Sequence, residues 1–131
     1  MRTMNSLALV GRILYALPLI GFGLGHLLAG AEMGGMVPAW VPGGGTFWIY
    51  CTGVALIAGS LAIITGVMGR LAALLVAALL LLFVLTLHLP GWLEGGPNAI
   101  MSRMSLYKDL AMAGGALVIA ATFGARSPVR S

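Results

Sequence analysis

Four residues of this sequence carry side chains that can exchange protons or hold a polar ligand, and all four lie at the ends of long apolar stretches. His26 and His88 each end one stretch, and Lys108 and Asp109 begin another. A neutral imidazole can exchange a proton near pH 7, and a lysine donates hydrogen bonds to carbonyl oxygens. Ionisable groups inside an apolar segment are costly and usually have a function. These four are therefore the candidate catalytic residues.

The stretches that position them cover residues 7–29, 47–68, 71–89 and 106–125. The length of each stretch is close to the roughly 20 apolar residues that a membrane-spanning helix needs. The chain is 60% hydrophobic and 8% charged, whereas soluble domains have about 25% charged residues. The sequence therefore predicts an all-α fold, an integral membrane four-helix bundle. Residues 1–131 are expected to form a single transmembrane domain.

Basic residues are distributed unevenly between the two sides of such a bundle. One side carries arginines alone: Arg2, Arg12, Arg70, Arg126 and Arg130. The other side carries both histidines, all three acidic residues, Arg103 and Lys108. Because positively charged flanks stay in the cytoplasm, we expect both termini there and the loops at 30–46 and 90–105 in the periplasm. The expected location is the bacterial plasma (inner) membrane, as a multi-pass protein.

Helix rise places the candidate groups at a similar depth. Counted from the arginine of the same helix at about 1.5 Å per residue, His26 lies about 21 Å away, Asp109 about 25 Å and His88 about 27 Å. Three helices thus bring a titratable group to one level near the outer interface, and Lys108 adjoins Asp109. We expect these four residues to line one cavity at the outer end of the bundle.

Each candidate also has a purely structural interpretation. Both histidines can be packing residues, and a helix C-terminus favours a cationic His88. Asp109 in the first turn of a helix is favoured by the helix dipole and could cap that helix. Lys108 in the same turn opposes the dipole, so it needs a carboxylate partner or a ligand. The Lys108–Asp109 pair is therefore the part of the site to test first.

Aromatic residues gather on the same side of the bundle, at positions 40, 48, 50, 92 and 107. Tryptophan and tyrosine typically form a belt at a membrane interface. Their rings can also stack on a flat ligand. On this second interpretation the candidate cofactor-binding residues are Trp40, Trp48 and Tyr107.

Several site classes are not indicated. Two histidines and a carboxylate could suit zinc or non-haem iron, but no H-x-x-E-H spacing is present. There is no C-x-x-C-H haem motif, so neither metal nor haem is expected. Cys51 is the only cysteine, which excludes an intrachain disulfide, and we expect it to be a buried packing residue. Single arginines beside apolar runs favour membrane topology over nucleic-acid binding.

Five segments carry a family resemblance: GH at 25–26, VPAWVP at 37–42, FWIYCTG at 47–53, LHLP at 87–90 and LYKDLAMAGGA at 106–116. Together they resemble the DoxX family of small four-helix membrane proteins, over about residues 11–121. The resemblance implies a four-helix bundle and an association with redox biology. One member of that family is the membrane subunit of an archaeal thiosulfate:quinone oxidoreductase.

Two function classes follow. The first is a membrane subunit of a redox system, in a quinone-linked oxidoreductase, that binds quinone near the periplasmic end. His26 or His88 would take a proton there, and Lys108 or Tyr107 would hold a carbonyl oxygen. The second is a non-catalytic membrane partner that docks or assembles another protein through its outer loops. The expected partners are the lipid bilayer, quinone, and further copies of the chain or a soluble redox protein.

Overall fold

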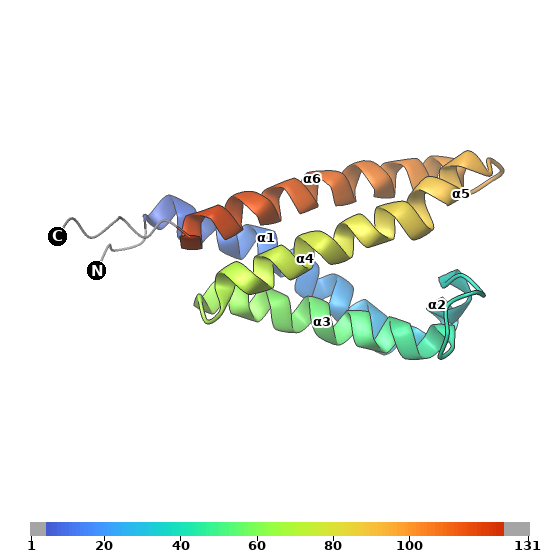
Figure 1. Cartoon of the computed structure of the whole chain (residues 1–131), viewed down its shortest axis with the longest axis horizontal. Helices are drawn as coiled ribbons and strands as arrows, with labels where there is room; N and C mark the ends of the chain where they lie inside the picture. Colours follow the sequence, from blue (N-terminus) through green and yellow to red (C-terminus); the bar gives the residue numbers. More distant parts are fainter. Residues whose placement is uncertain (1–4, 125–131) are drawn as a thin grey trace.

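The computed structural model describes residues 5–124, and four of its helical stretches are long and apolar enough to cross a membrane. These spans are Ser6–Leu28, Gly45–Thr65, Gly69–Leu93 and Ala99–Gly124. They lie along one another as an elongated bundle (Figure 1). The predicted all-α fold with four membrane-length helices is confirmed. The sides of the membrane on which the ends lie stay a prediction.

The helices follow one another as α1 (Ser6–Leu28), α2 (Gly30–Met33), η1 (Gly34–Met36), α3 (Gly45–Thr65), α4 (Gly69–Phe83), η2 (Val84–His88), α5 (Leu89–Leu93) and α6 (Ala99–Gly124). The side chain of Asn5 caps α1 by accepting from the N–H of Leu7 at 3.0 Å. Gly66 ends α3 with a φ of 81°, a left-handed conformation that glycine adopts without strain. The tight turn that follows makes α3 and α4 antiparallel neighbours.

The third span is longer than predicted. It was expected to end at residue 89, because Pro90 cannot donate a hydrogen bond within a helix. Instead the chain forms the π-helical turn η2, in which the N–H of Leu89 donates to the carbonyl of Val84, and continues through α5 to Leu93. A local π turn is one way in which a membrane helix accommodates a proline. His88 therefore lies inside the span and not at a helix end, so the C-terminal dipole argument is wrong.

The fourth span begins earlier than predicted, at Ala99 and not at residue 106. Ser102, Arg103 and Ser105 interrupt the apolar pattern, but such residues do not prevent helix formation. Lys108 and Asp109 consequently lie in the third turn of α6. Capping and the helix dipole act on the first turn, so they do not explain this pair.

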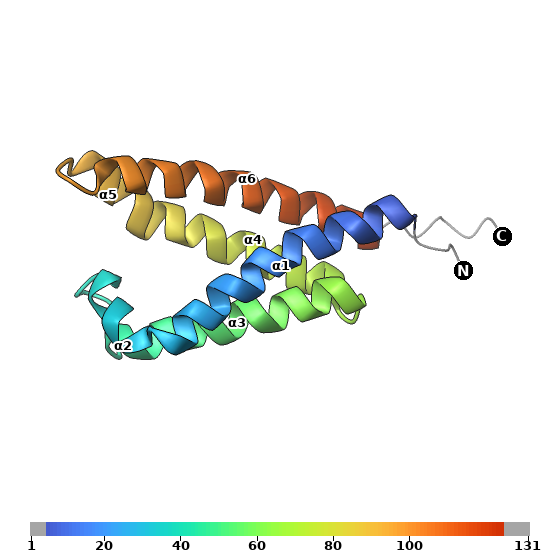
Figure 2. The ribbon, with the colours of Figure 1, turned by 180° about the vertical axis from the view of Figure 1, so that it is seen from behind.

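The bundle consists of two helix pairs, α1 with α3 and α4 with α6, which are joined mainly by contacts between α3 and α4. The pairs lie close together near the start of α1 and the end of α6, and they diverge toward α2 and α5 (Figures 1 and 2). Small buried residues let α4 and α6 approach closely. They are Ala72, Ala73, Ala77, Ala113, Ala116 and Ala120.

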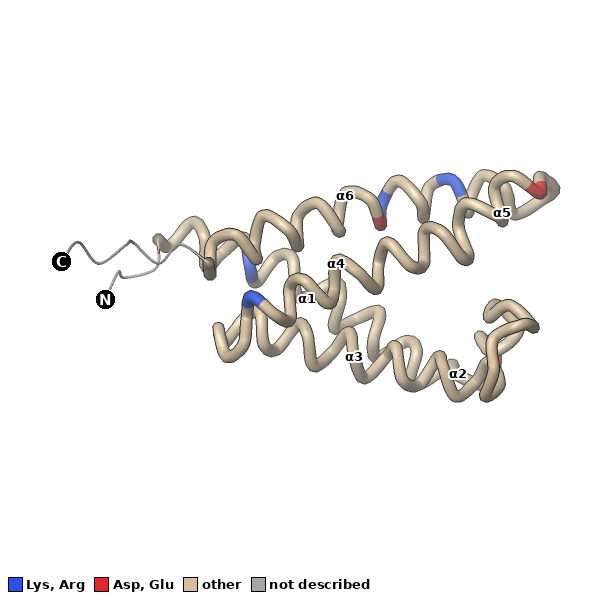
Figure 3. The backbone as a smooth tube through the Cα atoms, viewed as in Figure 1, with Lys and Arg blue, Asp and Glu red and all other residues tan. Residues whose placement is uncertain are grey.

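The two ends of the bundle differ in charge. We call the end with Arg12, Arg70 and the turn at 66–68 the arginine end, and the end with the loops at 37–44 and 94–98 the loop end. In Figure 3, two basic positions lie toward the arginine end and the acidic positions lie in the other half. Residues 2, 126 and 130, which the topology prediction also uses, lie outside the described residues.

The arginine end is closed by a buried cation. Arg12 is 6% exposed. Its Nε donates to the carbonyl of Ile63 at 2.7 Å, and its Nη2 donates to that of Ile64 at 3.0 Å. The guanidinium also lies over the ring of Phe123, 4.5 Å from the centroid. Carbonyls in the last turn of a helix have no partner within it, so Arg12 satisfies the end of α3 and ties α1 and α6 to it.

Cys51 faces outward from α3. The prediction that it is a buried packing residue is wrong, because its side chain is exposed. Nearly uniform apolar helices carry little information on rotation, so the sequence did not show which face is buried.

Candidate functional site

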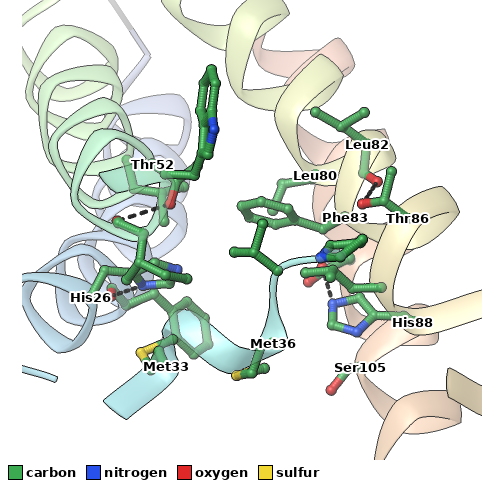
Figure 4. Close-up of a pocket in the computed structure, with 18 of the residues that line it drawn as sticks. His26, Met33, Met36, Thr52, Leu80, Leu82, Phe83, Thr86, His88 and Ser105 are labelled. Carbon is green, nitrogen blue, oxygen red and sulfur yellow. Dashed lines mark hydrogen bonds and ion pairs between the residues drawn. The ribbon is translucent and has the colours of Figure 1, made fainter. Parts of the chain in front are cut away.

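A cavity of about 470 Å³ lies between the two helix pairs, toward the loop end (Figure 4). Such a volume falls within the roughly 300–1,000 Å³ of small-molecule sites. Its deeper wall is apolar and includes Leu19, Leu56 and Leu80. Residues of the α2–η1 segment and the loop after it, including Met33 and Met36, cover it from the loop end.

One wall of this apolar cavity carries a cluster of three polar side chains, His88, Lys108 and Asp109. The Nε2 of His88 lies 3.0 Å from Oδ2 of Asp109, and the Nζ of Lys108 lies 3.5 Å from Oδ1. The Asp109 side chain is 4% exposed, whereas that of Lys108 is 44% exposed. A buried carboxylate thus lies between two donors, and the ammonium group next to it can reach a ligand.

The π-helical turn η2 carries His88 on the third span, and Asp109 meets it from α6. Because a π turn is wider than an α turn, it changes the direction of the residues that follow it. π turns are frequently found at functional sites. Figure 4 shows the His88 ring on the side of the cavity formed by the third span and α6.

His26 lies on the opposite side of the cavity, on α1 (Figure 4). Its Nδ1 lies 2.7 Å from the carbonyl oxygen of Phe22, one turn earlier in the same helix. A carbonyl can only accept, so Nδ1 is the protonated nitrogen and Nε2 carries the lone pair in the neutral ring. The bond to the helix backbone agrees with a structural role, yet the ring also lines the cavity.

Lys108 links the two helix pairs across the cavity. Its Nζ lies 4.3 Å from the ring centroid of Phe22, in a cation–π contact between α6 and α1. Contacts between α1 and α6 are otherwise sparse. The lysine is therefore held by an aromatic ring on one side and by the Asp109 carboxylate on the other.

All four candidate catalytic residues line this one cavity, and so do Trp40 and Trp48. Tyr107 does not: it is 55% exposed and packs edge-on against Trp92, with 6.1 Å between centroids. Successive residues of a helix are rotated by about 100°, so the two-residue step from Tyr107 to Asp109 turns the helix by about 200°. Tyr107 therefore points to nearly the opposite side of α6 from Asp109, which faces the cavity. The prediction that Tyr107 holds a ligand in this cavity is therefore wrong.

The cavity lining also contains three hydroxyl groups that are not among the predicted site residues, those of Thr52, Thr86 and Ser105. Thr52 and Thr86 donate to backbone carbonyls of their own helices, at 3.0 and 2.7 Å. Ser105 precedes Asp109 by four residues, so helical spacing places both on one face. That spacing was a signal that could have identified Ser105.

Within residues 5–124, no three side chains of His, Cys, Asp or Glu come together in a way that could hold a metal ion. The polar groups of the cavity are instead spaced along its walls, on α1, α3, the third span and α6. Such an arrangement suits hydrogen bonds to a small organic molecule whose body lies against the apolar surface.

A family described as "Domain of unknown function (DUF8561)" matches residues 15–120. The chain belongs to this family. The match to DUF8561 contains every residue that lines the cavity, from Leu19 to Asp109. No curated protein and no solved structure matches the chain. The resemblance to DoxX therefore stays a prediction.

Proposed function

We propose that this chain is a membrane subunit of a redox system and that its cavity binds a quinone or a similar flat, neutral molecule. The observation that carries the proposal is the His88–Asp109–Lys108 cluster on one wall of an otherwise apolar cavity, within a bundle of membrane-length helices. A lipid-soluble molecule with a small polar head matches both parts of such a site.

The charges of the cavity favour a neutral ligand. Lys108 and Asp109 carry opposite charges, and Nζ of the lysine lies 3.5 Å from Oδ1 of the aspartate. With both histidines neutral, the lining groups therefore carry no net charge. An anionic or cationic ligand would remain uncompensated in this apolar environment, which is costly. A quinone brings polar oxygen atoms without a charge.

The geometry supports a separate role for each polar residue. The ammonium of Lys108 donates to a ligand oxygen, and this residue is the exposed member of the cluster. Asp109 orients the His88 ring by accepting from Nε2, so Nδ1 is the atom that exchanges a proton. Trp48 and Phe83 line the cavity and offer flat faces to the ring of the ligand.

Conversion of a quinone to a quinol takes up two electrons and two protons. We assign proton exchange to the cavity and electron delivery to a partner protein that carries a redox cofactor. That partner would approach from the loop end, to which the cavity lies closest. On this proposal the arginine end is cytoplasmic and the loop end faces the periplasm of a bacterial inner membrane.

A second candidate function is a non-catalytic docking subunit. It is favoured by η1 and the loop after it, where Met36 is 56% exposed and Trp40 is 74% exposed. Exposed aromatic and methionine side chains are enriched at protein interfaces. A bound small molecule in the cavity distinguishes the first function from the second.

The proposal is tested by extracting the small molecules that co-purify with the protein in lipid nanodiscs. Ser105→Trp places a large side chain in the cavity, whereas Met104→Trp adds the same ring at a position that is 58% exposed and outside the cavity lining. We expect chromatography with mass spectrometry to find quinone enriched over empty nanodiscs in wild type and Met104→Trp, and lost in Ser105→Trp. Equal quinone content in all samples, including empty nanodiscs, would contradict the proposal.

A further inference from the structure

We infer that the cavity prefers the reduced form of its ligand, a quinol with two hydroxyl groups, over the oxidised quinone. The inference rests on the proposed function and deepens it by naming the redox state that fits. Its basis is the hydrogen bonding of the two histidines, which leaves each neutral ring with an acceptor atom and no donor for the ligand.

His88 is held in one tautomer by Asp109. A carboxylate accepts hydrogen bonds, so Nε2 must carry the proton in the 3.0 Å contact with Oδ2. In the neutral ring, Nδ1 then has a lone pair and no proton. Within the part of the chain that the structure describes, Nδ1 has no hydrogen-bond partner.

His26 is held in the opposite tautomer, with the same consequence. The carbonyl of Phe22 can only accept, so Nδ1 carries the proton and Nε2 carries the lone pair. No other residue from 5 to 124 bonds to this ring. The two histidines lie on opposite sides of the cavity (Figure 4), so a ligand between them meets an acceptor from either side.

The other polar groups of the lining leave few donors. The hydroxyls of Thr52 and Thr86 already donate to backbone carbonyls, and the indole N–H of Trp48 donates to the carbonyl of Pro42. Lys108, Ser105 and the indole N–H of Trp40 remain able to donate to a ligand. The lining therefore offers free acceptors on the two histidines and free donors on these three side chains.

This pattern matches a quinol better than a quinone. The two hydroxyl groups of a quinol can donate to the two imidazoles, and each of its oxygens can still accept from Lys108 or Ser105. The two carbonyl groups of a quinone only accept, so a histidine facing one of them leaves two lone pairs opposed and unpaired. Polar groups left unpaired in a site reduce affinity strongly.

Anaerobic titration calorimetry at pH 8 in nanodiscs tests the inference, with a decyl-substituted benzoquinone and its quinol as probes. We expect the quinol to bind about 25-fold more tightly, because each of two hydrogen bonds contributes about fivefold. His26→Phe keeps a ring of similar size and removes one acceptor. It should lower the preference about fivefold, whereas Tyr107→Phe, outside the cavity, should leave it unchanged.

The outcomes separate this inference from the proposed function. Saturable binding of both forms with equal affinity, or with the quinone bound more tightly, would overturn the inference and leave the proposed function standing. Absence of saturable binding of either form would overturn the proposed function and the inference with it. A quinol preference that His26→Phe does not change would overturn the assignment of His26 as one of the two acceptors.

Discussion

The arginine end and the loop end each bury a charged side chain, but they satisfy it in different ways. Arg12 is bonded to the backbone of α3 and covered by Phe123, so its charge stabilises the junction of three helices. Asp109 is bonded to two side chains, His88 and Lys108, each of which also lines a cavity. The first arrangement is closed, and the second leaves polar atoms available to a ligand.

This difference distinguishes the two buried charges better than their burial does. Arg12 and Asp109 are 6% and 3% exposed, so exposure alone does not distinguish them. What distinguishes them is the kind of partner. Arg12 bonds to backbone carbonyls at a helix end, which need a donor in any case, whereas Asp109 bonds to two side chains that also line a cavity.

The two ends of the bundle are expected to differ most in how introduced cysteines react from outside the cell. In a Cys51→Ser background, we expect Gly35→Cys at the loop end to react with a membrane-impermeant maleimide from outside intact cells, and Val67→Cys at the arginine end not to react. Both positions are exposed, and a Cβ at Gly35 meets no atom within 4 Å, so accessibility does not limit the reaction. The opposite labelling pattern would contradict the proposed orientation.

A large loss of stability is expected at the arginine end. Arg12→Met removes the donors for the carbonyls of Ile63 and Ile64, and we expect the free energy of unfolding to fall by about 3 kcal/mol. Unfolding in sodium dodecyl sulfate, followed by circular dichroism, measures it. Arg70→Met at an exposed position of the same end is the control and should change little. Equal effects of the two substitutions would show that the buried contacts of Arg12 do not stabilise the bundle.

A smaller effect, on ligand affinity, is expected when the carboxylate that orients His88 at the loop end is replaced. Asp109→Asn keeps the size of the side chain but removes the charge that faces His88 and Lys108. We expect ligand affinity to fall about tenfold, or about 1.4 kcal/mol. Glu94→Gln removes an exposed acid of the same end that does not line the cavity, and calorimetry should find its affinity unchanged. An Asp109→Asn protein with wild-type affinity would show that the carboxylate does not organise the site.

Much of this arrangement could be predicted because helix rise is constant and charges avoid lipid. The distance from the arginines placed His26, His88 and Asp109 at one depth, and the structure brings them to one cavity together with Lys108. What each residue does there stays a prediction. Their depth was accessible from the sequence because it depends only on the number of residues along each helix.

The rotation of each helix about its axis, and the residues at which helices begin and end, could not be predicted from the sequence in the same way. Tyr107 was grouped with Lys108 although it faces away from the cavity, because the apolar residues around it indicate no preferred face. The π turn before Pro90 depends on local backbone bonding that a hydropathy pattern does not contain. The early start of α6 at Ala99 does not follow from hydropathy, because Ser102, Arg103 and Ser105 interrupt the apolar pattern without ending the helix.

Binding of the ligand by the Lys108 ammonium at the loop end can be tested by a single titration. Lys108→Met is compared with Arg103→Met, a loss of the same charge on α6 at an exposed position outside the cavity lining. We predict that the first loses at least tenfold in affinity for the decyl-substituted quinone and quinol while its circular dichroism stays that of the folded bundle. Arg103→Met should bind like wild type. A Lys108→Met protein that binds both forms with wild-type affinity would show that the ammonium does not hold the ligand.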